Sequence, residues 1–510
     1  MTSDGEKSIW QIEIPYPKYE NLQGDLEVDV CIVGAGIAGL TTAYLLACEN
    51  KSVAVIDARQ VGCGETGKST AHLTNAFDDR YYRVEEVHGE KVSKVVADSH
   101  TQAIDLIEKI IKDESLNCEF ERLDGYLFTE SNEILDRELE SAKKAGLNDI
   151  EKLSSLPLTL CKQPCLRFAN QAQINPLKYI IQLAQVATKK GVRIFDNALV
   201  QKVQGGSDRH VLTDRGIKIK SNHIVVATNT PINDLVVIHD KQSSNRSYVI
   251  GALITKGSVP KALYWDNEDP YHYVRLQNGS DFSDEYKDYD ILIVGGEDHK
   301  CGTEHDGEER YKRLEHFARK NFASIHSVPF HWSGHIQEPI DYLGYLGRNP
   351  LDDENIYVCT GDSGNGMTHG TIAALIFRDL ICKKENPWVT TYDPSRKSFQ
   401  PSSIKKFAMN NMENLATYSE YFTKGDVEKE DDIKPGCGAI LRDGINKVAT
   451  YKDNDGKVHK CSAICPHLQC LVNWNPTEKS WDCPCHGSRF DAYGKVLNGP
   501  ACKNLEPMKK

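Results

Sequence analysis

The sequence lacks several features that would place the protein at a membrane or on nucleic acid. It has no apolar run of the roughly 18 to 20 residues that a membrane-spanning helix requires. Its formal net charge is −12, so a basic surface for phosphate backbones or anionic lipids is not expected. The first residues, from Met1 to Lys7, are polar and acidic, unlike a secretory or mitochondrial leader. We therefore expect a soluble, cytoplasmic protein that binds neither nucleic acid nor membrane.

The chain also lacks internal repeats, and its cysteines are unevenly distributed. At 510 residues it is long enough for about three domain-sized units. Seven of its 16 cysteines lie between positions 437 and 502, and the others are scattered. Cys31, Cys48 and Cys359 fall in apolar strand or helix patterns, which is typical of buried small side chains. The C-terminal group therefore calls for a separate explanation.

Two cysteines and two histidines in that C-terminal group have the spacing of a metal-ligand set. Cys465 and His467 form a C-x-H pair, and Cys483 and His486 form a C-x2-H pair after fifteen intervening residues. Thiolates on one iron and neutral imidazoles on the other are the ligands of a Rieske 2Fe-2S centre, and the imidazoles raise its reduction potential. A structural zinc site is the alternative, but zinc usually takes C-x2-4-C paired with H-x3-5-H or a second C-x2-C. The spacing favours an electron-carrying 2Fe-2S cluster.

The two segments that carry these residues, 465–470 and 483–491, resemble the cluster-binding loops of the Rieske family. The resemblance implies a disulfide between Cys470 and Cys485, and a hydrogen bond from Ser488 to a bridging sulfide. Gln469 departs from the family pattern, which usually has glycine there. Phe490 stands where high-potential members have a hydrogen-bonding tyrosine, so we expect a lower potential than in respiratory Rieske proteins.

The N-terminal part carries a dinucleotide-binding pattern. The apolar run 28–33 predicts a strand and leads into Gly34, Gly36 and Gly39, which are followed by a helical pattern. A second apolar strand, 53–56, ends at Asp57, 23 positions after Gly34. In this pattern the glycines let a pyrophosphate approach a helix N-terminus, and the acidic side chain binds a ribose hydroxyl. No second glycine fingerprint of this kind follows.

Three later segments decide between FAD and NAD. Residues 61–74, 224–229 and 355–370 resemble the flavin-contacting segments of D-amino-acid oxidase-like flavoproteins. Cys63 lies in the first of them, where it is either a packing residue or a covalent flavin tether. The residues expected to bind FAD are Gly34, Gly36, Gly39, Asp57, Thr66, Gly67, Thr70, Ala227, Thr228, Gly364, Gly366, Met367 and Thr368.

The whole chain thus resembles fusions of an FAD-dependent D-amino-acid oxidase-like oxidoreductase with a C-terminal Rieske domain. The implied fold is an α/β Rossmann-like FAD-binding domain with an inserted α+β substrate domain, followed by a small all-β Rieske domain. We predict an N-terminal extension over residues 1–27 and an FAD domain over 28–395, with substrate or cap parts at about 77–170 and 245–330. A linker with one helix is expected over 396–432, and the Rieske domain over 433–510.

Catalytic residues are less sharply indicated. Hydride transfer to flavin depends more on positioning the substrate than on an acid or a base. The candidates for the substrate face lie on the predicted sheet and in the segment before the last FAD strand: Tyr273, Arg275, Trp332, His335, Gln337 and Asp341. Each has an ordinary interpretation as well, since Trp332 and Tyr273 suit a core and Arg275 suits a solvated surface.

These patterns support one functional hypothesis and two alternatives. The first is an FAD enzyme that oxidises a small organic substrate, an amine or an amino acid, and releases electrons singly through the Rieske cluster. The second is an electron-transfer reductase that serves a partner enzyme, and the third is a flavoprotein whose cluster is a redox sensor or a structural staple. A small-molecule substrate is expected in the first case, and a one-electron acceptor protein is a candidate partner.

Overall fold

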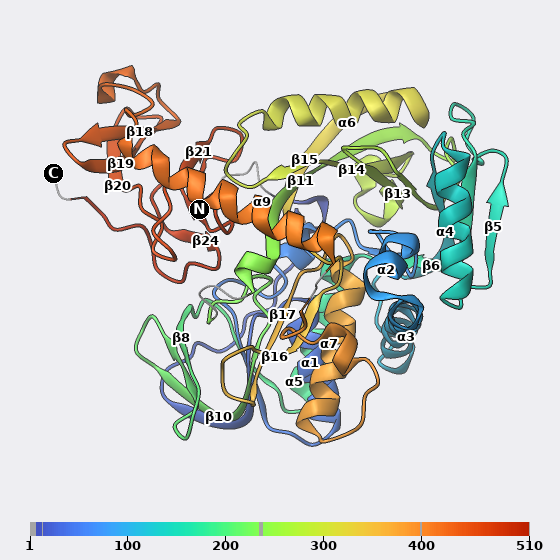
Figure 1. Ribbon diagram of the computed structural model, residues 1–510, viewed down its shortest axis with the longest axis horizontal. Helices are drawn as coiled ribbons and strands as arrows, with labels where there is room; N and C mark the ends of the chain where they lie inside the picture. Colours follow the sequence, from blue (N-terminus) through green and yellow to red (C-terminus); the bar gives the residue numbers. More distant parts are fainter. Residues whose placement is uncertain (1–6, 13, 234–237, 398–399, 509–510) are drawn as a thin grey trace.

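A computed structural model describes residues 7–12, 14–233, 238–397 and 400–508 of the chain. It confirms the expected fold class, an FAD-binding α/β domain with an α+β insertion and a small all-β C-terminal part (Figure 1). Residues 1–6 of the expected N-terminal extension lie outside the described residues. The rest of that extension begins by packing on the loop after the second strand, because Trp10 Nε1 donates a hydrogen bond to the Ser69 carbonyl at 2.8 Å.

The first sheet forms the nucleotide-binding layer at the bottom of Figure 1. Its strand order is β16 (Tyr345–Arg348), β17 (Ile356–Thr360), β10 (Lys218–Val226), β1 (Leu26–Val33), β2 (Val53–Ile56) and β7 (Arg193–Phe195), with β8 (Val200–Gln204) and β9 (His210–Thr213) attached at β10. From β17 to β7 the strands are parallel, and β16 is antiparallel to β17. Their near-continuous apolar sequences suit this buried position.

Helices α1 (Ile37–Cys48), α5 (Pro176–Lys189) and α7 (Gly366–Ile381) belong to this layer. The register places Val33 beside Val226 and Ile56, so β1, β2 and β10 end at one edge of the sheet. In open α/β sheets this edge is where ligands bind.

The second sheet forms the inserted layer. Its order is β15 (Ile325–Pro339), β11 (Gln242–Thr255), β14 (Tyr289–Lys300), β13 (His272–Asn278), β12 (Leu263–Asp266), β4 (Glu121–Phe128), β6 (Cys165–Gln173) and β3 (His72–Leu73), with β5 (Ile150–Leu153) on β6. Helices α2 (Tyr81–His88), α3 (Glu90–Asp113), α4 (Asn132–Lys144) and α6 (Gly307–Asn321) accompany it. The start of β11 and the end of β15 pair at Gln242 and Pro339 and lie close to the first sheet, because Thr360 Oγ1 of β17 donates a hydrogen bond to Gln242 Oε1 at 3.2 Å.

The C-terminal part consists of two small antiparallel sheets. One contains β18 (Cys437–Asp443), β19 (Asn446–Lys452) and β20 (Val458–Ser462), and the other contains β21 (Asn473–Asn475), β22 (Ser480–Asp482), β23 (Arg489–Asp491) and β24 (Val496–Asn498). Trp474 and Trp481 pack with ring centroids 4.8 Å apart in its core. A close-packed core of this kind holds the loops of the C-terminal part in fixed positions.

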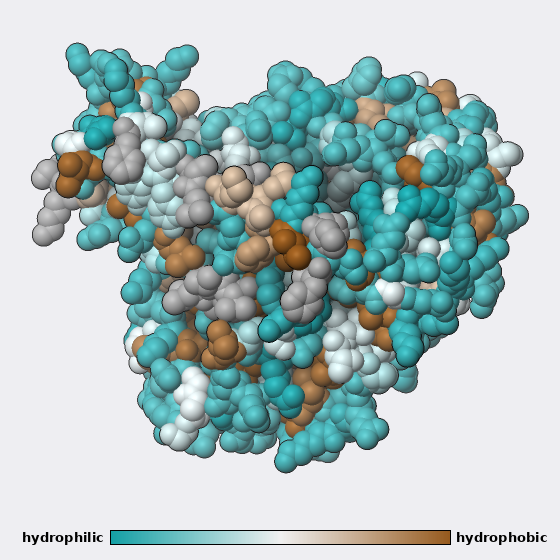
Figure 2. All heavy atoms as spheres, viewed as in Figure 1, coloured by the Kyte–Doolittle hydropathy of each residue, from teal (hydrophilic) through white to brown (hydrophobic). Residues whose placement is uncertain are grey.

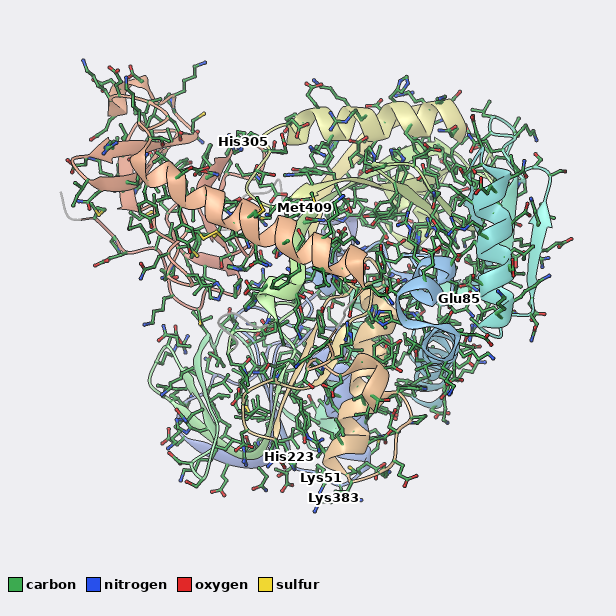
Figure 3. All side chains as sticks on the ribbon, in the orientation of Figure 1. Lys51, Glu85, His223, His305, Lys383 and Met409 are labelled. Carbon is green, nitrogen blue, oxygen red and sulfur yellow. A yellow bond between two sulfur atoms is a disulfide. The ribbon has the colours of Figure 1, made fainter. Side chains whose placement is uncertain are left out.

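Helix α8 (Val389–Tyr392) lies just before the expected linker. The linker contains one long helix, α9 (Pro401–Thr417), followed by a 3-10 turn at Tyr418–Phe422. Helix α9 crosses the front of the molecule between the FAD-binding part and the C-terminal part (Figures 1 and 3, with Met409 labelled). Lys300 Nζ donates to Asn414 Oδ1 at 3.2 Å, which attaches the helix to β14. Ile404, Phe407 and Met412 of this helix are exposed. Figure 2 shows apolar side chains, drawn in brown, near the middle of this face of the molecule, where the helix crosses in Figure 1. Among the described residues, no helix is both long and apolar enough to cross a membrane.

Candidate functional site

The glycines after β1 form a cradle that larger residues would fill. Gly34 has φ +108°, and a Cβ there would lie 2.3 Å from the Ala227 carbonyl oxygen. A Cβ on Gly39 would lie 1.9 Å from the Gly34 oxygen, and one on Gly36 would lie 2.9 Å from Thr66 Oγ1. Thr66 Oγ1 also accepts a hydrogen bond from the Ile37 N–H at 3.0 Å. The sequence therefore folds into a tight turn that keeps the N-terminus of α1 open to a ligand.

Asp57 lies at the end of β2, as the dinucleotide pattern requires. Its carboxylate accepts hydrogen bonds from the Ala35 N–H at 2.7 Å and the Arg59 N–H at 2.8 Å. Burial raises the pKa of Asp57, and these bonds and the Arg59 charge oppose the increase. The two backbone bonds fix the carboxylate beside the glycine turn.

A single cavity of about 910 Å³ extends from this turn to the second sheet. Most of the predicted FAD residues line it: Gly34, Gly36, Asp57, Thr66, Thr70, Ala227, Thr228, Gly364, Gly366 and Met367. Gly39, Gly67 and Thr368 support the wall without lining it. Cys63 does not line it either, and burial raises the pKa of its thiol.

The cavity suits a large polar cofactor. His335 and His369 both line it, and each is buried with an Nε2 atom that has no hydrogen-bond partner among the described residues. Burial lowers the pKa of each imidazole to about 4, so both rings are neutral near pH 7. Neither atom faces the interior of the cavity, because a Cβ on Gly487 would lie 2.6 Å from His335 Nε2 and one on Gly344 would lie 3.1 Å from His369 Nε2. The volume of the cavity and the glycine cradle together fit FAD.

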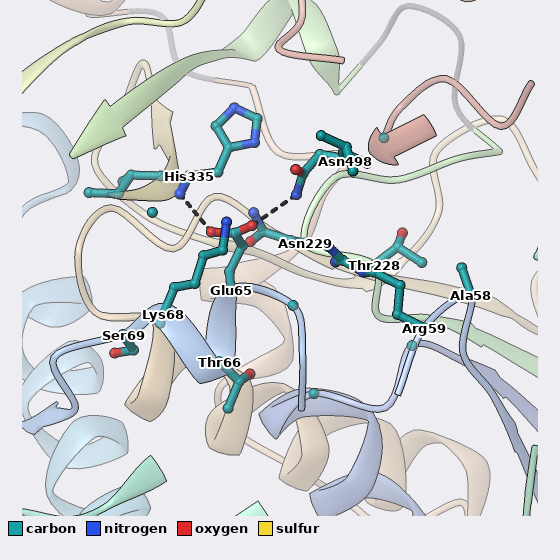
Figure 4. Close-up of a pocket in the computed structure, with 18 of the residues that line it drawn as sticks. Ala58, Arg59, Glu65, Thr66, Lys68, Ser69, Thr228, Asn229, His335 and Asn498 are labelled. Atoms are coloured by element: carbon teal, nitrogen blue, oxygen red, sulfur yellow. Dashed lines mark hydrogen bonds between the residues drawn. The ribbon is translucent and has the colours of Figure 1, made fainter. Parts of the chain in front are cut away.

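Glu65 is a charged residue in the middle of the cavity wall that the sequence did not single out (Figure 4). Its carboxylate accepts hydrogen bonds from the His335 N–H at 2.6 Å and from Asn498 Nδ2 at 2.8 Å. Burial alone would raise the pKa of Glu65, but Lys68, His335 and Arg246 outweigh it and lower the pKa to about 2. The signal that could have identified Glu65 is that it is the one acidic residue in segment 61–74, which consists mostly of small residues.

Of the remaining candidates for the substrate face, Tyr273 lines the cavity, while the side chains of four others are directed elsewhere. Trp332 Nε1 donates to the Lys68 carbonyl at 2.8 Å. The Arg275 guanidinium donates to the carbonyls of Thr70 at 2.8 Å and Ile174 at 2.9 Å. Asp341 is paired with Arg396 at 2.8 Å, and Gln337 lies between the two parts of the molecule, as described below.

The predicted cluster ligands meet at the tip of the C-terminal part. Cys465, Cys483 and His486 are buried, and the rings of His467 and His486 lie 5.0 Å apart at 90°. The thiols of Cys465 and Cys483 are hydrogen-bonded to each other. A pair of thiols facing a pair of imidazoles fits the donor set of a Rieske 2Fe-2S cluster.

The disulfide implied by the resemblance is present. Cys470 and Cys485 are joined, with their Cα atoms 6.5 Å apart, so neither thiol is available as a ligand. Gln469 has φ +63°, which explains why glycine is usual at this position. The Ser488 hydroxyl is hydrogen-bonded to the Cys465 thiol, and Phe490 is buried beside the site.

The tip that carries the cluster ligands is docked on the FAD-binding part. The Ser244 hydroxyl lies 3.0 Å from the His486 carbonyl oxygen and 2.8 Å from Gln337 Oε1. The Gln337 N–H donates to Asp362 Oδ1 at 3.0 Å, and its carbonyl accepts from the Ser363 N–H at 3.0 Å. Since residues 362–366 line the cavity except for Ser363, hydrogen bonds connect a cluster ligand to the cavity wall.

Two further groups of residues hold the docked parts together. The ring of His239 packs against those of His467 at 4.9 Å and His486 at 5.6 Å. Arg246 on β11 is ion-paired with Glu478, which also pairs with Arg489, and all three side chains are buried. The contacts of His239 and Arg246 with the C-terminal part were not predictable from the sequence, because each joins residues more than 200 positions apart.

The cavity and the cluster site together define an FAD-dependent oxidoreductase that carries a Rieske iron–sulfur centre. Comparison with family models agrees: residues 29–380 match the FAD dependent oxidoreductase family, and residues 424–509 match the Rieske [2Fe-2S] domain. The chain belongs to the FAD-dependent oxidoreductase family and has a C-terminal Rieske domain. Its cofactors are FAD and a 2Fe-2S cluster.

Several known proteins are similar to this chain. The Bacillus subtilis (strain 168) protein YhfW, whose name describes it as a Rieske 2Fe-2S iron-sulfur protein, is 31% identical over 99% of this chain and 98% of its own length. Gamma-glutamylputrescine oxidoreductase of Escherichia coli (strain K12) is 23% identical over 72% of this chain and 86% of its own. Among solved structures, glycine oxidase from Geobacillus kaustophilus has a TM-score of 0.58 at 16% identity, covering 73% of this chain and 99% of that one. The structural likeness shows the fold.

Proposed function

We propose that the protein oxidises a small organic substrate, an amine or an amino acid, and passes the electrons one at a time to the Rieske cluster of the same chain. Bound FAD supplies a two-electron acceptor that can release its electrons singly, and a 2Fe-2S cluster takes one at a time. Relatives named for gamma-glutamylputrescine and glycine support this substrate class. A cytoplasmic location and a one-electron acceptor protein as partner remain predictions.

The observation that carries the proposal is the docking of the cluster tip on the cavity wall. His486 contacts Ser244, and Ser244 contacts Gln337, whose backbone is bonded to the loop at Asp362. This short bonded connection supports electron transfer in the docked arrangement, with no swing of the linker. The residues of the chain act here by fixing the two cofactor sites at a constant separation and by excluding water between them.

A second candidate, a structural or sensing role for the cluster, is favoured by one contact. Asn498 of the C-terminal part donates a hydrogen bond to Glu65 and so completes the wall of the cavity. On this interpretation the C-terminal part closes the FAD site without carrying electrons.

Anaerobic mixing of the holoprotein with a panel of amines and amino acids tests the proposal. Flavin bleaching, followed by absorbance, should precede cluster reduction, followed by electron paramagnetic resonance, within one turnover. A flavin that stays bleached beside an oxidised cluster would contradict electron transfer and favour the structural role. In that case Cys465→Ser should leave turnover with an artificial flavin oxidant unchanged.

A further inference from the structure

One end of the cavity combines carboxylates with aromatic rings, and we call it the acidic–aromatic end. Asp78, Trp265, Tyr271 and Tyr273 line it, and Asp298 adjoins it through the hydroxyls of Ser247 and Tyr271. The rings of Tyr271 and Tyr273 lie 5.8 Å apart at 36°. Carboxylates surrounded by aromatic rings form the environment in which proteins hold alkylammonium groups.

This end adjoins the loop that follows β17. A Cβ on Gly364 would lie 2.5 Å from Asp78 Oδ2 and 3.6 Å from the Tyr271 hydroxyl. The Asp78 N–H donates to Asn365 Oδ1 at 3.1 Å. Because Gly364 and Gly366 belong to the predicted FAD-binding segment, a molecule held at this end lies beside the cofactor site.

Asp298 is the residue that most clearly lacks a partner. Both of its carboxylate oxygens are buried, and neither has a hydrogen bond of good geometry within the described part of the chain. Burial raises the pKa of Asp298 to about 8, against the smaller lowering effect of Ser247, and Glu338 and Asp78 raise it further. A buried carboxyl whose charged neighbours are other carboxyls is stabilised when a cation binds.

The other carboxyls of this region also raise one another's pKa. Burial raises the pKa of Asp78 to about 6, with Glu338 adding to the increase and Arg80 opposing it. Burial likewise raises the pKa of Asp79 to about 6, with Asp78 adding to it. Arg80 lies 3.9 Å from Asp78, and Arg83 and Lys406 also oppose these increases, but the pKa of each carboxyl stays above its ordinary value.

An amino-acid carboxylate would need a cation here, and the nearby arginines are already committed. Arg80 Nη2 donates to the Asp266 carbonyl at 2.8 Å and Nε to Asn267 Oδ1 at 3.2 Å. Arg275 donates to backbone carbonyls, as described above. The described residues that form the acidic–aromatic end include no lysine or arginine, and Lys68 lies beside Glu65, in the part of the cavity drawn in Figure 4.

We propose that the acidic–aromatic end binds the ammonium group of an alkylamine substrate that carries no carboxylate next to the amine. This inference rests on the proposed function, because it names the substrate class of the same site. It places Asp78 as the carboxylate that contacts the ammonium group, and Tyr271 and Tyr273 as the rings that surround it. Asp298 adds negative charge from behind the hydroxyls of Ser247 and Tyr271.

The test is a binding titration of the oxidised holoprotein, without turnover, with three four-carbon probes: n-butylamine, 2-aminobutanoate and butanoate. Calorimetry and the perturbation of the flavin spectrum report binding. We expect n-butylamine to bind about 10-fold or more tightly than either carboxylate probe, and Asp298→Asn to weaken it by about 10-fold or more. Asp288→Asn, which removes the same charge at an exposed position before β14, should leave the affinity unchanged.

Equal or tighter binding of 2-aminobutanoate or butanoate, or unchanged n-butylamine affinity in Asp298→Asn, would overturn the proposal. If Asp298→Asn does not fold, Tyr271→Phe removes only a hydroxyl near the same carboxyls, and an unaltered affinity there counts equally against it. Electron transfer from a photoreduced flavin to the cluster, measured with no amine present, tests the proposed function separately. The proposed substrate class and the proposed electron transfer can therefore be refuted independently of each other.

Discussion

Glu478→Gln is the sharpest test of the docked arrangement. Glu478 is buried between Arg246 of the FAD-binding part and Arg489 of the Rieske domain, and both guanidinium groups bond to it. The substitution keeps the size of the side chain but removes the negative charge between the two guanidinium groups and leaves one acceptor oxygen for both of them. Arg246 also bonds to the Ser333 hydroxyl, and Arg489 keeps Asp482 at 2.9 Å. Breaking a buried ion pair by removing one charge costs about 3–5 kcal/mol.

Arg246 belongs to the FAD-binding part and Glu478 to the Rieske domain. The lost ion pair therefore reduces the free energy that holds these two parts together. At about 1.4 kcal/mol per tenfold, the docking equilibrium should shift by a factor on the order of 100 to several thousand. We expect small-angle scattering to report a more extended molecule and flavin-to-cluster transfer to slow, while the spectra of both cofactors stay normal.

Glu315→Gln is the matched control. It removes the same charge from a partly exposed i, i+4 pair with Arg319, and surface pairs contribute about 0–1 kcal/mol. Transfer rates and scattering that are alike in Glu478→Gln, Glu315→Gln and the wild type would refute the argument that this ion pair holds the parts together.

The same residue gives a pH dependence. Burial alone would raise the pKa of Glu478, but Arg246 and Arg489 outweigh it and lower the pKa to about 2. Since an unfolded glutamate titrates at about 4.3, the stabilisation from Glu478 is fully present above that pH and is lost as the pH falls toward 2. Docking measured by scattering should therefore be insensitive to this group between about pH 5 and 8.

Three further predictions concern the cofactors and their connection. Cys465→Ser should abolish the 2Fe-2S spectrum and leave yellow FAD bound, and stoichiometric zinc without iron in anaerobically purified wild type would contradict the ligand assignment. Gly36→Val should eliminate flavin, because even a Cβ there lies 2.9 Å from Thr66 Oγ1, and full flavin occupancy measured by absorbance would disprove it. Ser244→Ala removes the hydroxyl that bonds to both His486 and Gln337. Flavin-to-cluster electron transfer, measured by stopped flow, should therefore slow several-fold while the reduction potential of the cluster stays unchanged. An unaltered rate would show that electrons do not use this connection.

The cofactor sites were predictable from the sequence because each depends on short segments. Gly34, Gly36 and Asp57 act within one strand–turn–helix–strand unit, so their spacing alone indicates the turn. Cys465 and His467 are likewise close in sequence, and the disulfide followed from the resemblance. The fold class came from the same motifs, since the glycine fingerprint and the cluster loops each belong to one type of domain.

The contacts between the two parts were not predictable in this way. Arg246 and Glu478 meet only after each domain has folded, and arginine and glutamate are ordinary surface residues in a sequence. Arg275 was proposed for the substrate face because it lies with Tyr273 on the predicted sheet, yet its guanidinium donates to backbone carbonyls. Tyr271 and Asp298 lie within the expected substrate part at about 245–330, but the Tyr271 hydroxyl approaches Gly364, which lies 93 positions further along the chain.

Helix α9 connects the two cofactor-binding parts covalently, and this has a consequence for kinetics. A tethered partner is present at an effective concentration set by the length of its connection, commonly in the millimolar range for short linkers. The Rieske tip therefore returns to the same surface after any separation, whatever the amount of protein in solution. Flavin-to-cluster transfer should be first order and independent of dilution, whereas the same two domains on separate chains would depend on their concentrations.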